Sequence, residues 1–146
     1  MDDDVANLNA EVESLWAKLD LGPAVPVPSA ANRQEASWYV EALLDRFRFS
    51  HWERGRAEPV TGWLARPDAV QWVLEQSAVA IALNEECRQR GNGGYSRWNW
   101  MAPATAMLDR ISPEHGSALA SRYAQVLTDN PLSEAERRAA RHPLPH

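Results

Sequence analysis

Cysteine and lysine are almost absent from this chain, and each shortage excludes a class of structure or chemistry. Cys87 is the only cysteine among 146 residues, so no internal disulfide can form and a reducing compartment is the simplest assumption. Lys18 is the only lysine. The glycine-rich segment 91–94 is therefore not a phosphate-binding P-loop, because that motif requires its own lysine. The chain also lacks the Gly-x-Ser-x-Gly pattern of a serine nucleophile elbow.

Long apolar runs are missing as well. No stretch approaches the roughly 18 residues of a membrane span. The acidic start Asp2-Asp3-Asp4 does not resemble the basic and apolar beginning of a secretory signal. We therefore expect a cytoplasmic protein with no membrane partner. The net charge of −5 argues against nucleic acid as the partner of the whole protein.

The residues that bind metals are few and dispersed. The prolines that follow His142 prevent a helix from bringing this side chain together with His146. No other pair has the spacing of a zinc or di-iron site; the candidates are His51, Cys87, His115, His142 and His146. We therefore expect no metal and no cofactor. Without a catalytic signature, the sequence favours a protein that is not an enzyme.

Helical signals run along most of the chain. Pro67 suits a first helical position, Asp68 faces the positive end of the helix dipole, and Gly91 can form a left-handed cap. They frame a helix at about residues 67–90 in which apolar side chains recur at helical spacing. The sequence therefore predicts an all-α fold, a bundle of five to six helices around this long central helix. No segment is predicted as a strand.

The predicted domain organisation is a single helical domain over residues 1–146. Residues 1–21 form an amphipathic N-terminal helix, because apolar side chains between Val5 and Leu19 recur every three or four positions. Residues 22–31 are a proline-rich connector, residues 32–141 the helical core and residues 142–146 a frayed tail. In the core, capping boxes at Asn32/Glu35 and Ser133/Glu136 start helices at about 33–54 and 133–141. Pro103 and Ser112-Pro113 start two more.

Tryptophan and arginine carry the functional prediction. Seven tryptophans stand against two phenylalanines and three tyrosines, more than one core needs. Trp, Tyr and Arg most often carry the binding energy of protein interfaces. The sequence therefore predicts a non-catalytic helical protein-binding module, an accessory subunit, adaptor or inhibitor. Its partner is another protein or a second copy in a homodimer, and its predicted partner-binding residues are Trp98, Trp100, Tyr95, Arg97, Trp52 and His51.

Two other functions fit the same residues. The first is a helical bundle that binds or converts a small molecule in an aromatic-lined pocket, with His51 and Glu53 as polar anchors. The second is a binder of single-stranded nucleic acid, in which the arginines between Arg88 and Arg97 hold phosphates while Trp98 and Trp100 stack on bases.

Overall fold

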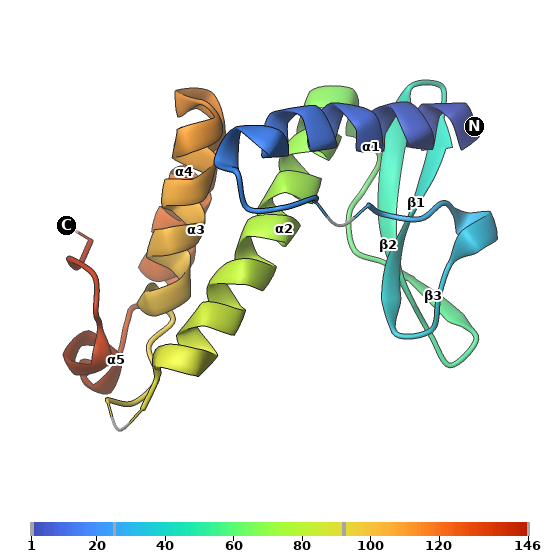
Figure 1. Ribbon diagram of the computed structural model, residues 1–146. Coiled ribbons are helices and arrows are strands. Elements are labelled where there is room, and N and C mark those ends of the chain that lie inside the picture. Colours follow the sequence, from blue (N-terminus) through green and yellow to red (C-terminus); the bar gives the residue numbers. More distant parts are fainter. Residues whose placement is uncertain (1, 25, 92, 146) are drawn as a thin grey trace. The chain divides into compact units, whose positions relative to one another are not determined.

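Strands follow the proline-rich connector, where the sequence predicted a helix. The computed structural model describes residues 2–24, 26–91 and 93–145. Strand β1 spans Ser37–Leu43, β2 Arg46–Glu53, β3 Arg56–Pro59 and β4 Leu64–Ala65. The strands pair antiparallel in the order β1-β2-β3 (Figure 1). Strand β4 also pairs antiparallel with β2, at the end of β2 that β3 does not reach. The all-α prediction is therefore wrong, because the protein is a mixed α/β fold.

The hairpin of β1 and β2 replaces the helix predicted at 33–54. Its strands are joined by Leu44 and Asp45, whose φ angles of 50° and 58° are those of a type I′ turn. Such turns usually contain Asn or Gly, so the residues Leu44 and Asp45 gave no indication of a hairpin in the sequence. The predicted capping box is also absent. Asn32 ends the short 3₁₀-helix η2 (Ala30–Asn32), and the Glu35 carboxylate accepts a hydrogen bond from the backbone of Arg54.

The described residues form five α-helices (Figure 1). The helix predicted at 67–90 is present as α2, Arg66–Gln89, with Asp68 in its first turn. The other four helices are α1 (Asp2–Trp16, continued by the 3₁₀-helix η1, Ala17–Leu19), α3 (Trp98–Ile111), α4 (Pro113–Asp129) and α5 (Glu134–Ala139). Helix α3 begins five residues before Pro103, where the sequence predicted its start.

The chain divides into two compact units, residues 1–74 and 75–146, and α2 contributes to both. In unit 1 the inner face of the sheet holds Val40, Phe47 and Phe49, which are fully buried. Trp72 of α2 stacks on Phe49 with ring centroids 4.1 Å apart. Helix α1 contacts β1, and the side-chain amide of Asn9 bonds both the backbone N–H and the carbonyl of Val27. Unit 1 is thus a small sheet with helical cover on one face.

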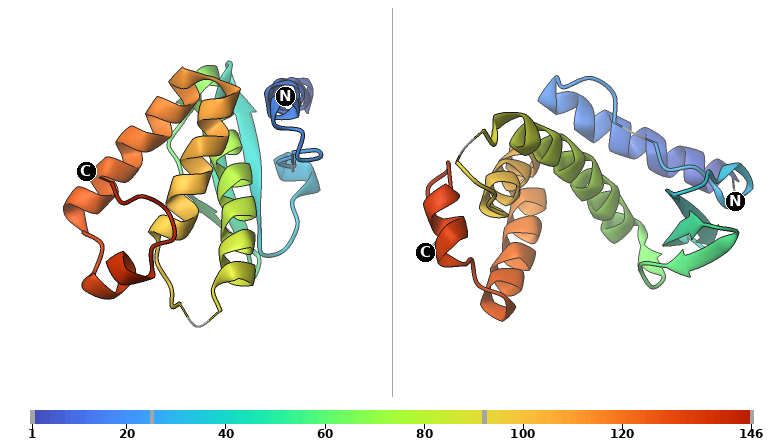
Figure 2. Two further views of the ribbon diagram at one scale, coloured as in Figure 1. Left: turned by 60° about the vertical axis from the view of Figure 1, so that its left-hand side comes forward. Right: turned by 90° about the horizontal axis from the view of Figure 1, so that it is seen from below.

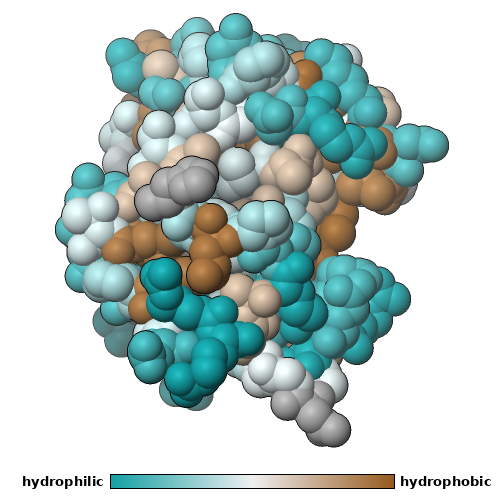
Figure 3. Space-filling model, turned by 90° about the vertical axis from the view of Figure 1, so that its left-hand side faces the viewer, coloured by the Kyte–Doolittle hydropathy of each residue, from teal (hydrophilic) through white to brown (hydrophobic). Residues whose placement is uncertain are grey.

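Unit 2 is built on the antiparallel pair of α3 and α4, which lie side by side in both views of Figure 2. The Ser112 hydroxyl caps α4 by accepting from the backbone N–H of His115, as the sequence predicted. Gly116 brings α4 close to α3, because a Cβ there would lie 2.7 Å from the Asp109 Cα. On the face shown in Figure 3, hydrophobic residues form separate patches between hydrophilic ones.

Candidate functional site

The six predicted partner-binding residues fall in both units. His51 and Trp52 lie on β2 in unit 1, and the other four, Tyr95, Arg97, Trp98 and Trp100, lie at the start of α3 or just before it in unit 2. Consecutive residues of a strand point to opposite faces, so His51 and Trp52 do not share a surface. The two groups are therefore described separately.

His51 lies on the inner face of the sheet, beyond its buried centre. Its ring meets Trp38 edge-on with centroids 4.9 Å apart, and its Nδ1 atom is 3.9 Å from a carboxylate oxygen of Glu53. A hollow of about 340 Å³ opens here, lined by His51, Glu53, Arg54, Arg56 and Glu58. Charged side chains therefore dominate this hollow, and its lining includes no aromatic residue except His51.

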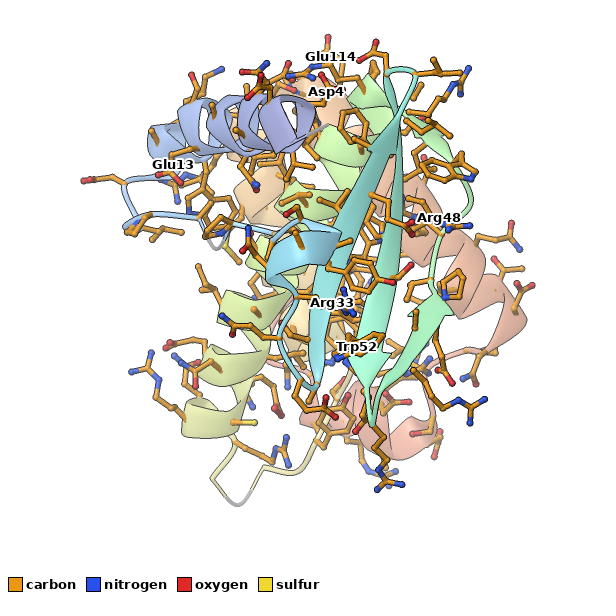
Figure 4. All side chains as sticks on the ribbon, turned by 90° about the vertical axis from the view of Figure 1, so that its right-hand side faces the viewer. Asp4, Glu13, Arg33, Arg48, Trp52 and Glu114 are labelled. Atoms are coloured by element: carbon orange, nitrogen blue, oxygen red, sulfur yellow. The ribbon has the colours of Figure 1, made fainter. Side chains whose placement is uncertain are left out.

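Trp52 lies on the outer face of the sheet, where Arg33 covers its ring. The Arg33 guanidinium carbon is 4.0 Å from the ring centroid, and its Nη1 donates to the carbonyl of Ala30. Figure 4 looks onto this face, with Arg33, Trp52 and Arg48 labelled and α1 not in front of the sheet. A cation placed over an indole ring is attracted by the ring quadrupole, so this pair is held in a defined geometry at the surface.

A second arginine–tryptophan pair lies on the same face. The Arg48 guanidinium carbon is 4.7 Å from the ring centroid of Trp63, in the loop before β4. Nε and Nη2 of Arg48 also donate to one carboxylate oxygen of Glu41, its cross-strand partner, at 3.2 and 3.0 Å. We call the surface formed by Arg33, Glu41, Arg48, Trp52 and Trp63 the outer face.

Tyr39 and Ser50 lie at the centre of the outer face. They are opposite each other in the register of β1 and β2 and are only 5% and 1% exposed. The side chains of Arg48 and Trp52 flank Ser50 along the strand. The Ser50 hydroxyl has no hydrogen-bond partner among the described residues. The outer face is therefore a packed layer with a buried centre rather than a row of isolated side chains.

In unit 2, Arg97 holds the C-terminal segment. Its Nε and Nη2 donate to the two carboxylate oxygens of Glu136 at 2.8 and 3.0 Å, and Nη2 also donates to the carbonyl of Pro131. These bonds raise the pKa of Arg97 and lower the pKa of Glu136 to about 2, although burial opposes both shifts. Arg97 thus makes a structural contact within the chain.

The next two residues of α3 bind the same segment. The Trp98 Nε1 donates to the carbonyl of Pro143 at 2.7 Å. The buried Asn99 amide donates to the carbonyl of Ala139 and accepts from the backbone N–H of Arg141. Pro143, in the tail predicted to be frayed, is therefore attached to α3, while His146 lies outside the described residues.

Tyr95 and Trp100 belong to a partly exposed aromatic cluster in unit 2. The Tyr95 hydroxyl accepts from Trp100 Nε1 at 2.9 Å, and Arg90 lies over the Tyr95 ring. Tyr123 of α4 meets Trp100 edge-on. Burial, helped by the nearby Glu75 carboxylate, raises the pKa of Tyr123 to about 12. At the other end, Arg90 pairs with the buried Glu86 and lowers the pKa of that carboxyl.

Sequence reasoning missed most of the outer face. Arg33, Glu41, Arg48 and Trp63 were not singled out, and only Trp52 was. The signal that could have found them is the strict alternation Arg46-Phe47-Arg48-Phe49, which is typical of a strand with one apolar and one polar face.

No described helix combines the length and apolar character needed to cross a membrane. Among residues 2–24, 26–91 and 93–145, no three His, Cys, Asp or Glu side chains are placed to hold a metal ion. Comparisons with models of protein families, with curated proteins and with solved structures find no match for this chain.

Proposed function

We propose that this chain is a non-catalytic protein-binding module whose partner docks on the outer face of the unit 1 sheet. The observation that carries the proposal is the pair of arginine–tryptophan stacks, Arg33 on Trp52 and Arg48 on Trp63, on a sheet face that α1 leaves uncovered. Trp and Arg are the residues that interfaces use most as energetic centres.

The arrangement suits a binding surface because its long side chains are already ordered. An arginine that becomes fixed on binding loses about 0.5–1.5 kcal/mol of side-chain entropy. Arg48 is held by both Glu41 and Trp63 before any partner arrives. The buried Tyr39 and Ser50 beneath give the surface a rigid base. A partner therefore meets a preorganised layer and avoids part of that cost.

Nucleic acid fits the same surface less well. Single-stranded binders leave aromatic ring faces open so that bases can stack on them. Here guanidinium groups already cover the rings of Trp52 and Trp63. The net charge of −5 also repels a polyanion from the molecule as a whole. Both observations favour a protein partner.

The proposed interface includes only part of the partner-binding patch that the sequence predicted. Arg97 and Trp98 bind the C-terminal segment of their own chain, which makes them poor candidates for a partner. Tyr95 and Trp100 keep exposed surface, so they are the remaining candidates for a partner-binding site in unit 2. Trp52 is the predicted residue that lies on the proposed interface.

The test is affinity capture from the lysate of the native host with quantitative mass spectrometry. The double variant Trp52→Ala, Trp63→Ala removes both stacked rings. The control is Leu44→Ala, which removes an exposed apolar side chain at the hairpin turn and leaves every residue of the outer face in place. Thermal melting checks that each variant folds. We expect one stoichiometric protein that the tryptophan variant loses and the leucine variant keeps.

Two results would contradict the proposal. A protein retained by the tryptophan variant but lost from Tyr95→Ala, Trp100→Ala would move the interface to unit 2. The absence of any stoichiometric protein would favour the second candidate, a small molecule in the hollow beside His51 and Glu53. For that function, a thermal-shift screen of charged metabolites should find a stabilising compound whose effect disappears in His51→Ala.

A further inference from the structure

We infer that the partner presents a cluster of carboxylates to the outer face; this inference rests on the proposed function. The register places Arg46 and Arg48 on the same side of β2 as Trp52. With Arg33, three arginines stand against Glu41 on this surface. A protein whose net charge is −5 therefore has one sheet face with an excess of positive charge, and charge complementarity selects an acidic partner.

The arginines have donors to spare. Arg48 uses Nε and Nη2 on Glu41, and Arg33 uses Nη1 on Ala30, whereas a guanidinium carries five N–H groups. The side chain of Arg46 takes part in no hydrogen bond or ion pair found among the described residues. Arg46 and Arg48 are two residues apart on one strand, which separates their side chains by about 7 Å. Carboxylates one turn apart on a helix, or two residues apart on a strand, match this spacing.

The partner docks face-on and does not extend the sheet. The backbone N–H of Val60 donates to the carbonyl of Phe49. In this register the backbone N–H and C=O groups of every second residue before Val60, at Ala57 and Pro59 of β3, point away from β2. Pro59 has no N–H to offer an added strand. At the other edge of the sheet, the N–H of Val40 already donates to the carbonyl of Pro28. Strand addition is therefore blocked at the middle of both edges, which leaves the side chains of the outer face as the contact.

Acidic residues border this surface at its ends. Glu35 lies next to the turn between β2 and β3, where it accepts from the Arg54 backbone, and Asp45 lies in the turn between β1 and β2. Arg46 directly follows Asp45, and Trp52 is two residues before Arg54, so both carboxylates lie close to the ends of the basic surface. The positive excess therefore comes from the strand face itself, where Arg46 and Arg48 stand beside Glu41, and from Arg33 over Trp52.

The experiment is a selection of random short peptides displayed on phage against the full-length protein, with Trp52→Ala, Trp63→Ala as the counter-selecting surface. We expect the enriched peptides to contain several Asp or Glu residues together with an apolar residue. Their affinity should fall at least about fivefold in Arg46→Gln, because a charge pair is lost. The same single loss of charge in Arg56→Gln, on the opposite face of the sheet, should leave the affinity unchanged.

The outcomes separate this inference from the proposed function. Peptides that depend on Trp52 and Trp63 but are neutral or basic, or that are insensitive to Arg46→Gln, would overturn the acidic partner and leave a protein-binding face. Enriched peptides that bind equally well without Trp52 and Trp63 would overturn both the acidic partner and the proposed interface on the outer face. Oligothymidylate is the last probe: if it binds the outer face and the peptides do not, the partner is a nucleic acid and the inference fails.

Discussion

Replacing Glu136 by glutamine should loosen the C-terminal segment, because one carboxylate collects four hydrogen bonds. It accepts from Nε and Nη2 of Arg97, from the backbone N–H of Arg97, and from the backbone N–H of Ser133 in the capping box. Glutamine keeps the size of the side chain but removes its charge. It also places an amide N–H₂ among groups that are themselves donors.

The magnitude follows from the pKa of Glu136, which falls from 4.5 to about 2, mainly because Arg97 hydrogen-bonds the charged form. A fall of this size corresponds to roughly 3 kcal/mol at most. The side chains of Glu136 and Arg97 are 15% and 18% exposed, so solvent screening reduces this value only in part. Because the folded pKa is lowered, the contribution is complete above about pH 4.5 and is lost as the pH falls through 2. We expect Glu136→Gln to cost about 2–3 kcal/mol near neutral pH.

The assay is amide hydrogen exchange of α5 and of Arg141, combined with urea unfolding, at neutral pH and near pH 2. Exchange is needed because the segment can open before the domain unfolds. The control is Glu134→Gln in the same helix, whose carboxylate is almost fully exposed and 3.4 Å from Arg138. Exposed pairs of this kind contribute under about 1 kcal/mol. Equal effects of the two variants at neutral pH, or a difference that persists near pH 2, would refute the reasoning.

Three other substitutions test the packing. Gly116→Ala should cost about 2 kcal/mol or more in urea unfolding, because its Cβ would lie 2.7 Å from the backbone of Asp109; an unchanged midpoint would contradict this close approach. Ser50→Ala should be neutral or stabilise by up to about 1 kcal/mol, since the buried hydroxyl has no partner; clear destabilisation would show an unseen hydrogen bond. Asn99→Ala should speed exchange of the Arg141 amide about tenfold or more, because that N–H loses its acceptor; unaltered protection would show that other contacts hold the segment.

Helix boundaries with polar caps could be predicted from the sequence. Ser112 caps α4, and Ser133 with Glu136 forms the capping box that opens α5. These devices act over three residues, so the information is local. The same locality explains why α2 was found within one residue of its limits. None of these signals reports which helices pack together.

The hairpin of β1 and β2 could not be recognised by the same reasoning. Its apolar residues Val40, Leu43, Leu44 and Phe47 are spaced by three or four positions, which also fits a helix. In the structure Leu44 is 89% exposed, because it occupies a turn with positive φ. Leu43 is also exposed, so of these four residues only Val40 and Phe47 lie on the buried face, together with Phe49. The helical spacing thus depended on two exposed leucines at the hairpin turn.

An error in secondary structure also changes which predicted site residues share a surface. The prediction joined His51 to Trp52 because they are consecutive, but a strand sends them to opposite faces. Trp98 and Trp100 are separated in the same way on a helix, one toward Pro143 and the other toward Tyr95. The pairs that do form join Arg33 to Trp52 and Arg97 to Glu136, which are 19 and 39 positions apart. Composition drew attention to tryptophan and arginine, but which arginine covers which ring depends on loop residues such as Arg33 and Trp63 as well as on the strands.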